Sequence, residues 1–204
     1  MINQEQPSTE YVEFIEAYKD LHTQETKFKG SSLNPYVISI GKLILEYNCK
    51  TLLDYGCGKA LGYSDKCEEI QLKKPVQKIW NIDSYTLYDP AYPKYDTLPT
   101  STYDIVICTD VLEHIPEQDL DWVIERILNY STKIVFLNIC TAPALKHFKK
   151  GKFKGKNLHI SVFENKWWIK KIGKIWNNHK DIKIYLTLSD EKNKLPICFK
   201  KKEK

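Results

Sequence analysis

The chain has 204 residues, which is enough for one domain with a full hydrophobic core, and 42% of them are hydrophobic, as in an ordinary globular protein. No apolar run reaches the roughly 18–20 residues that a membrane span requires, and the polar, acidic N-terminus is unlike a signal peptide. We therefore expect a single domain over residues 1–204, with no membrane association and a cytoplasmic location. The six cysteines are scattered without a Cys-x-x-Cys pair, which favours buried free thiols over disulfides, and we expect no metal site.

The formal net charge of +5 is unevenly distributed along the chain. Acidic residues dominate up to Asp121, whereas lysine prevails from Lys133 onward. The densest group of lysines lies in residues 141–160 and consists of Lys146, Lys149, Lys150, Lys152, Lys154 and Lys156. A run of like charges is usually a solvated face, but it can also bind an anionic partner, so both interpretations stay open.

The N-terminal part of the chain predicts two helices. Ser8 or Thr9 can cap a helix that continues to about Leu21, because its apolar residues recur at helical spacing. A polar linker separates it from a second helix, for which Asn34 is the expected cap and Pro35 lies in the first turn.

The segment Leu52–Ala60 reads LLDYGCGKA and is the most informative in the chain. The apolar run that begins at Thr51 predicts a buried strand, and the two glycines allow a sharp turn and a close approach to a ligand. A helix that begins near Lys59 would direct its N-terminal amides at that ligand. A loop built for pyrophosphate would avoid a carboxylate, so Asp54 indicates a ligand with a cationic amine.

The rest of the chain alternates between helical and strand patterns. The expected helices are 62–74 (weak), 117–130 and 163–176, the expected strands are 85–89, 103–109, 134–139, 182–188 and 195–199, and 76–80 is a short strand or a turn. Such alternation predicts an α/β fold with a mostly parallel sheet that is covered on both faces.

Three segments together resemble class I S-adenosylmethionine-dependent methyltransferases. The pattern Asp-x-Gly-x-Gly-x-Ala that begins at Asp54 resembles the family's first motif, and the segment that ends in Asp89 and Pro90 resembles its second strand. The stretch from Tyr103 to Pro116 resembles the fourth strand with its following turn and is the most specific signal. The resemblance covers residues 51–140 well and implies a Rossmann-like class I methyltransferase fold.

The resemblance also implies S-adenosyl-L-methionine as the cofactor, bound at the carboxyl ends of the strands. Asp54 would hold the methionine ammonium group, directly or through water, and Asp89 would accept hydrogen bonds from the ribose diol. The simpler alternative for both acids is helix capping or turn formation. The predicted cofactor-binding residues are Asp54, Tyr55, Gly56, Cys57, Gly58, Asp89, Pro90, Thr97, Leu98, Asp110 and Val111.

Two further expectations from this resemblance concern residues 90–104 and residues 1–33. Residues 90–104 are too few for the helix and third strand that the family normally has here, so we expect that strand to be reduced or missing. The acid that often contacts adenine after that strand would then be missing as well, and backbone groups of Thr97 and Leu98 could make this contact instead. Class I enzymes often close the cofactor site with N-terminal helices, so residues 1–33 are expected to hold a helix and a candidate lid. The candidate lid residues are His22, Phe28, Lys29, Gly30 and Ser31.

Two histidines are the candidate catalytic residues. His114 lies in the segment that lines the methyl-transfer pocket of the resembling family. A neutral imidazole there could take a proton from an acceptor hydroxyl or amine, or it could simply pack beside Ile115 and Pro116. His159 ends the lysine-rich loop of residues 141–160, which would return over the same mouth on the acceptor side.

The sequence thus favours an enzyme that transfers a methyl group from S-adenosyl-L-methionine to a small polar or sugar-like molecule, because no appended recognition domain is visible. The first alternative is a nucleic-acid methyltransferase that contacts phosphates through the lysine-rich loop. The second alternative keeps the fold without methyl transfer, as a protein that binds the cofactor or cleaves it. The oligomeric state is left open.

Overall fold

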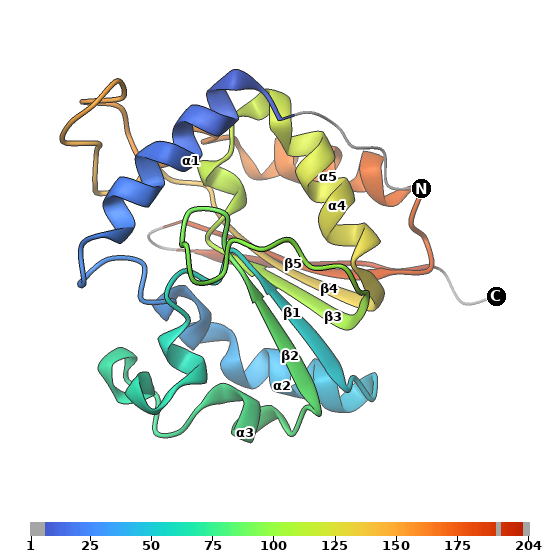
Figure 1. The fold of residues 1–204 in the computed structure, drawn as a ribbon. Coiled ribbons are helices and arrows are strands. Elements are labelled where there is room, and N and C mark those ends of the chain that lie inside the picture. Colours follow the sequence, from blue (N-terminus) through green and yellow to red (C-terminus); the bar gives the residue numbers. More distant parts are fainter. Residues whose placement is uncertain (1–6, 191–192, 202–204) are drawn as a thin grey trace.

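The protein is built on one six-stranded sheet, seen in a computed structural model that describes residues 7–190 and 193–201 (Figure 1). The first six residues of the predicted N-terminal segment lie outside the described residues. The strands are β1 (Thr51–Tyr55), β2 (Ser84–Tyr88), β3 (Tyr103–Thr109), β4 (Ser131–Cys140), β5 (Lys183–Ser189) and β6 (Lys194–Phe199). Their order is β2-β1-β3-β4-β5-β6, and only the pair β5–β6 is antiparallel. The predicted α/β fold with a mostly parallel sheet is therefore confirmed.

The centre of the sheet is apolar on both faces. Val106 of β3 pairs with Leu53 on one side and Val135 on the other, and all three are fully buried. Continuous apolar runs are typical of strands that are covered on both sides. At the edge, β2 is followed by residues 89–102, which form turns and contain no helix or strand. The described residues thus hold no strand beyond β2, as the short connection predicts.

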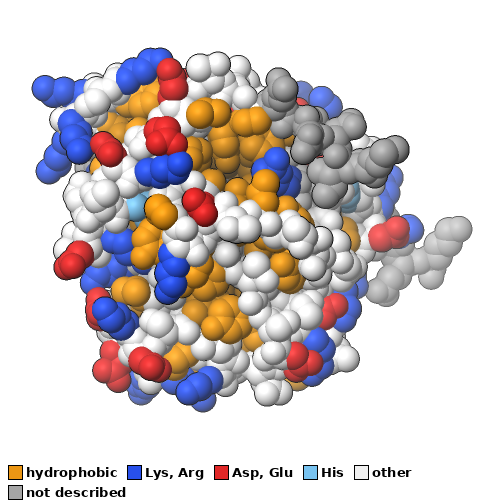
Figure 2. All heavy atoms as spheres, in the orientation of Figure 1, with side chains coloured by type: hydrophobic (Ala, Val, Ile, Leu, Met, Phe, Trp, Pro, Cys, Tyr) orange, Lys and Arg blue, Asp and Glu red, His pale blue; other side chains and the backbone are white. Residues whose placement is uncertain are grey.

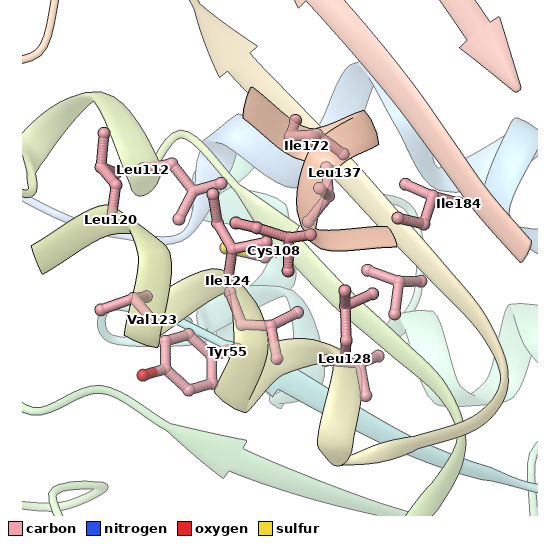
Figure 3. Packing of buried hydrophobic residues seen from close by; sticks show 14 of the residues in the cluster. Tyr55, Cys108, Leu112, Leu120, Val123, Ile124, Leu128, Leu137, Ile172 and Ile184 are labelled. Carbon is pink, nitrogen blue, oxygen red and sulfur yellow. The ribbon is translucent and has the colours of Figure 1, made fainter. Parts of the chain in front are cut away.

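Helices cover the sheet in two layers (Figure 1). The helices are α1 (Thr9–His22), α2 (Val37–Glu46), α3 (Val76–Trp80), α4 (Leu120–Asn129) and α5 (Asn165–Trp176). α1, α4 and α5 lie on one face, and α2 and α3 lie on the other. Figure 3 shows part of the larger core, where Ile124 of α4 and Ile172 of α5 pack against Leu137 of β4. None of the described helices is both long enough and apolar enough to cross a membrane.

Two predicted helix starts are wrong. Asn34 does not cap α2, because it lies in a 3₁₀ turn (Ser31–Tyr36) where its side-chain amide donates to the carbonyl of Ile70. No α-helix begins near Lys59, because Ala60 has a left-handed conformation with φ of 51°. The backbone amides of an α-helix are therefore not directed at the site from this position.

The next two predicted elements also differ. The helix expected over 62–74 is replaced by two 3₁₀ helices, Leu61–Tyr63 and Asp65–Ile70. Residues 76–80, expected as a strand or a turn, form α3. Val76 and Trp80 are both buried one helical turn apart, and the Trp80 indole donates to the carbonyl of Val37 at 2.8 Å. Packing against α2 thus decides the conformation of this short segment.

The first turn of α1 is fastened to the start of α4. Ser8 caps α1, as predicted, by accepting from the N–H of Tyr11 at 3.0 Å. The Ser8 N–H and hydroxyl donate to the Asp119 carboxylate at 2.9 and 2.5 Å, and the Trp122 indole donates to the same group at 2.8 Å. The beginning of α1 is therefore fixed by a buried carboxylate.

The lysine-rich loop of residues 141–160 packs along α1. Phe153 of the loop stacks on Phe14 of the helix with ring centroids 3.9 Å apart. Three ion pairs join the two segments: Lys150–Asp20 (3.3 Å), Lys152–Glu13 (2.6 Å) and Lys156–Glu10 (3.8 Å). Figure 2 shows lysine and acidic side chains close together over this part of the surface. Much of the loop's charge is thus matched within the protein.

Candidate active site

A cavity of about 590 Å³ lies at the carboxyl ends of the parallel strands. β1 has β2 on one side and β3 on the other, and open α/β sheets bind ligands where the strand order reverses in this way. The volume lies within the range of roughly 300–1,000 Å³ that small-molecule sites occupy. Its wall comes from α1, residues 26–32, 55–58 and 89–91, the turn after β3, the loop after β4, and Asp190.

The glycine loop after β1 forms a close-packed part of this wall. Gly56 and Gly58 have φ of 83° and 59°, in the left-handed region that glycine adopts without strain. A Cβ on Gly56 would lie 2.3 Å from Cγ2 of Val111, and a Cβ on Gly58 would lie 2.5 Å from the carbonyl oxygen of Phe28. Both positions therefore require glycine because neighbouring segments approach them.

The segment after α1 lies directly over the glycine loop. The N–H of Lys59 donates to the carbonyl of Phe28 at 2.7 Å, and the N–H of Leu61 donates to the carbonyl of Lys29 at 3.1 Å. His22 stacks on Phe28 with ring centroids 4.6 Å apart. Burial lowers the pKa of His22 to about 4, and the charge of Lys59 adds to this effect, so the ring is neutral. The predicted lid segment thus forms one wall of the cavity.

Asp89 lies on the cavity wall immediately after β2. Its carboxylate accepts from the N–H of Gly58 at 2.8 Å and from the N–H of Ala91 at 2.9 Å. Burial raises the pKa of Asp89, and the backbone donors oppose this effect. A carboxylate offers about four lone-pair positions, so further positions remain for a pair of ligand hydroxyls.

Asp54 does not line the cavity, although the sequence predicts it as the ammonium-binding acid. Side chains alternate along a strand, and Asp54 points to the same face as Leu52, whereas Tyr55 points to the other face and lines the cavity. Only 4% of Asp54 is exposed, and its carboxylate accepts from the hydroxyl of Tyr63 at 3.0 Å. Burial raises the pKa of Asp54 to about 7. A direct contact with a ligand in the cavity does not fit this position.

Most of the other predicted cofactor residues come together. Those on the cavity wall are Tyr55, Gly56, Cys57, Gly58, Asp89, Pro90, Asp110 and Val111. Thr97 and Leu98 are exposed and are not part of the wall, so the predicted adenine contact does not fit them. The reason is that the chain runs back toward the amino edge of the sheet, where the carbonyl of Pro99 accepts from the hydroxyl of Tyr130 at 2.9 Å.

The two predicted catalytic histidines are neighbours on the wall. Their ring centroids are 4.8 Å apart. Nδ1 of His114 lies 3.0 Å from the carbonyl of Leu158 and 2.8 Å from the hydroxyl of Tyr18, and Nδ1 of His159 lies 2.7 Å from the carbonyl of Ala142. A carbonyl only accepts hydrogen bonds, so the tautomer that satisfies Leu158 and Ala142 has its proton on Nδ1 and, in a neutral ring, leaves a lone pair on Nε2. Burial lowers the pKa of His114 to about 4, which keeps that ring neutral.

Glu113 and Tyr18 belong to this site but were not predicted as site residues. Glu113 is fully buried, and its Oε1 accepts from the N–H of Cys140 at 2.5 Å. Burial raises its pKa well above the ordinary value, and the negative charge of Asp110 adds to this effect. The helical spacing of Tyr18 signals burial, but it does not show that the hydroxyl reaches Leu158.

Lysines surround the mouth of the cavity. Lys27, Lys29 and Lys146 are on its wall, and Lys29 pairs with Glu69 at 3.1 Å. Burial lowers the pKa of Lys27, and the positive charges of Lys146 and Lys149 lower it further. The same wall also carries Asp89, Asp110 and Asp190, so lysine and carboxylate side chains both line the cavity, which suits strongly polar ligands.

Comparison with protein-family models, with curated proteins and with solved structures gives no match for this chain. The motif resemblance and the geometry of the cavity are therefore the features of this chain that indicate its function.

Proposed function

We propose that the protein is an S-adenosyl-L-methionine-dependent methyltransferase of the class I type. The observation that carries the proposal is the meeting of Gly56, Gly58 and the Asp89 carboxylate on one cavity wall at the carboxyl edge of a parallel sheet. The remaining lone pairs of Asp89 suit a ribose diol, and the glycine loop offers a close backbone approach. These residues lie in the segments that resemble the family motifs.

The proposed division of labour places the cofactor near the glycine loop and the acceptor near the two histidines. The cofactor supplies an intrinsically reactive sulfonium methyl group, so the protein mainly needs to align the acceptor and exclude water. α1 and the segment over the glycine loop enclose the cavity on one side. On the acceptor side, the unprotonated Nε2 atoms of His114 and His159 can receive a proton or bind an electrophile.

The proposed acceptor is a small polar or sugar-like molecule. A cavity of about 590 Å³ has to hold the reacting parts of both substrates, which favours a compact acceptor. The lysines at the mouth, Lys27 and Lys146 among them, favour an acceptor that carries phosphate, carboxylate or several hydroxyls.

Isothermal titration calorimetry with S-adenosyl-L-methionine and S-adenosylhomocysteine tests the cofactor assignment. We expect micromolar affinity for both, and we expect Asp89→Ala to weaken binding by roughly 1–3 kcal/mol, as for a charged hydrogen-bond acceptor lost from a buried site. Asp83→Ala is the matched control, because Asp83 is an exposed acid just before the opposite end of β2. Absence of heat and of any thermal shift with both ligands would refute the assignment.

A nucleic-acid methyltransferase is the second candidate, and the lysines at the mouth are the observation that favours it. The ion pairs between the lysine-rich loop and α1 weaken this case, because they use three of its charges within the protein. Binding to nucleic acid would fall steeply with salt, whereas binding of a compact acceptor would depend on it weakly. Incubation with the cofactor alone, followed by mass spectrometry, separates both from a cofactor-cleaving activity.

A further inference from the structure

Asp110, His114 and His159 lie on the cavity wall, and the fully buried Glu113 lies behind them, so the four side chains form a compact cluster of metal-ligand types. One ligand atom from each of Asp110, His114 and His159 lies within 4.8 Å of the others, and Glu113 and Cys140 form a second such group with His159. Bonds of about 2.0–2.2 Å hold the ligands of one ion no more than about 4.4 Å apart. Inward shifts of a few tenths of an ångström would therefore bring the first group to bonding distance.

Both histidines are prepared as ligands by their hydrogen bonds. Nδ1 of His114 donates toward the carbonyl of Leu158, and Nδ1 of His159 donates to the carbonyl of Ala142. Metal-binding histidines usually donate the second ring nitrogen to a carbonyl or a carboxylate in this way, which fixes the tautomer and the orientation of the ring. Both Nε2 lone pairs are consequently left for a further partner.

Glu113 supplies a second and independent observation. Its Oε2 atom is buried and has no hydrogen-bond donor within the described part of the chain. Its carboxyl group lies close enough to that of Asp110 for the two to interact, and two ionised carboxylates have no hydrogen-bond donor between them. A proton or a cation between them would satisfy both, and an unsatisfied buried carboxylate is costly.

The backbone at Asp110 is also unusual. Asp110 has φ of 60°, a left-handed conformation that aspartate and asparagine adopt more readily than other residues with a Cβ, and its N–H donates to the carbonyl of Asn138 at 3.1 Å. This conformation immediately follows β3 and places Asp110 on the cavity wall.

We propose that Asp110, His114 and His159, supported by Glu113, bind a divalent transition-metal ion at the cavity wall. Two imidazoles with carboxylates suit Mn²⁺, Fe²⁺, Co²⁺ or Zn²⁺ better than Mg²⁺ or Ca²⁺, which prefer oxygen ligands alone. Three protein ligands on a cavity wall would leave further coordination positions for water or a substrate atom. The role of the ion in methyl transfer rests on the proposed function: an acceptor hydroxyl would occupy one of the open coordination positions, and the ion would lower the pKa of that hydroxyl.

The test uses the full chain after treatment with EDTA and removal of the chelator. Titration with MnCl₂, followed by the loss of the free Mn²⁺ electron paramagnetic resonance signal, and calorimetry with ZnCl₂ should each reveal one site. We expect His159→Asn to weaken binding at least tenfold. His147→Asn is the matched control, because His147 is an exposed histidine of the same loop, and it should bind like the wild type.

Asp110→Asn is the second ligand variant, since asparagine tolerates the left-handed conformation and keeps the size of the side chain. It should also weaken binding at least tenfold with little change in Tm, which keeps the test valid if His159→Asn folds poorly. The proposal is overturned if no stoichiometric binding occurs up to about 1 mM of either metal, or if Asp110→Asn binds like the wild type. S-adenosylhomocysteine binding is measured in the same metal-free samples, so a failed metal site and a failed cofactor assignment give different results.

Discussion

Alanine at Gly58 should separate the cost of a left-handed backbone from the cost of displacing the segment over the glycine loop. Gly58 and Gly151 both have positive φ, 59° and 74°, so alanine at either position carries a similar strain of about 1–2 kcal/mol. A Cβ on Gly151 meets nothing within 4 Å, whereas a Cβ on Gly58 would lie 2.5 Å from the Phe28 carbonyl oxygen. Gly151→Ala is therefore the matched control.

The difference between the two variants follows from the contacts of Phe28. Relief of the clash requires the backbone at Phe28 to move, which also disturbs the hydrogen bond from Lys59 at 2.7 Å. Overpacking against a backbone atom costs about 1–3 kcal/mol, and the lost hydrogen bond costs about 1 kcal/mol. We therefore expect Gly58→Ala to be about 2–4 kcal/mol less stable than Gly151→Ala.

Urea unfolding measures this difference, and limited trypsin digestion shows where the strain is released. Lys27 and Lys29 are both trypsin sites within the displaced segment. Cleavage there should accelerate in Gly58→Ala and stay at the wild-type rate in Gly151→Ala. Equal unfolding free energies together with equal cleavage rates in the two variants would refute the idea that the segment is held against the glycine loop.

Two further predictions concern buried groups. Asp54 keeps its proton in the folded state up to about pH 7 and loses it near pH 3.8 when unfolded, so its contribution to the unfolding free energy falls as the pH rises through this window. The unfolding free energy of Asp54→Asn relative to that of the wild type should therefore rise by roughly 2–3 kcal/mol between pH 5 and pH 8. If urea unfolding shows a difference between the two proteins that does not vary with pH, the raised pKa is contradicted. The second prediction compares two neighbouring tryptophans of α5, because Trp168 is completely buried whereas Trp167 is partly exposed. Trp168→Ala should lower the unfolding free energy by about 3–5 kcal/mol, and Trp167→Ala should lower it by less than half as much. Similar losses in both variants would mean that the two rings contribute equally to the core.

The elements that could be predicted from the sequence are those with a strong local pattern. The apolar runs of β3 and β4 and the spacing in α4 specify buried elements by themselves, and the shortness of residues 90–104 excludes a further crossover. α3 could not be predicted, because its helical form depends on Trp80 packing against α2. The 3₁₀ turns after Ala60 depend in the same way on contacts with distant segments.

The candidate site was predictable where strand ends determine it. Gly56, Gly58 and Asp89 follow strands that a parallel sheet brings to one edge, so their meeting follows from the topology. The position of Asp54 depended on which face of β1 it occupies, and the motif does not reveal this. The cluster around Glu113 depended on the return of the loop before His159, which places residues about 45 positions apart in contact.

The continuation of α1 into the segment over the glycine loop has a consequence for the lifetime of a bound ligand. Asp119 holds the first turn, while the far end of the helix leads into the segment that covers the glycine loop. A molecule enclosed beneath that segment would leave when the segment opens locally, without unfolding of the sheet, and local opening of this kind takes from about microseconds to seconds. The lifetime of a bound ligand would thus be set by a few contacts of Phe28 and Lys29, and substitutions there could change it while the sheet stays the same.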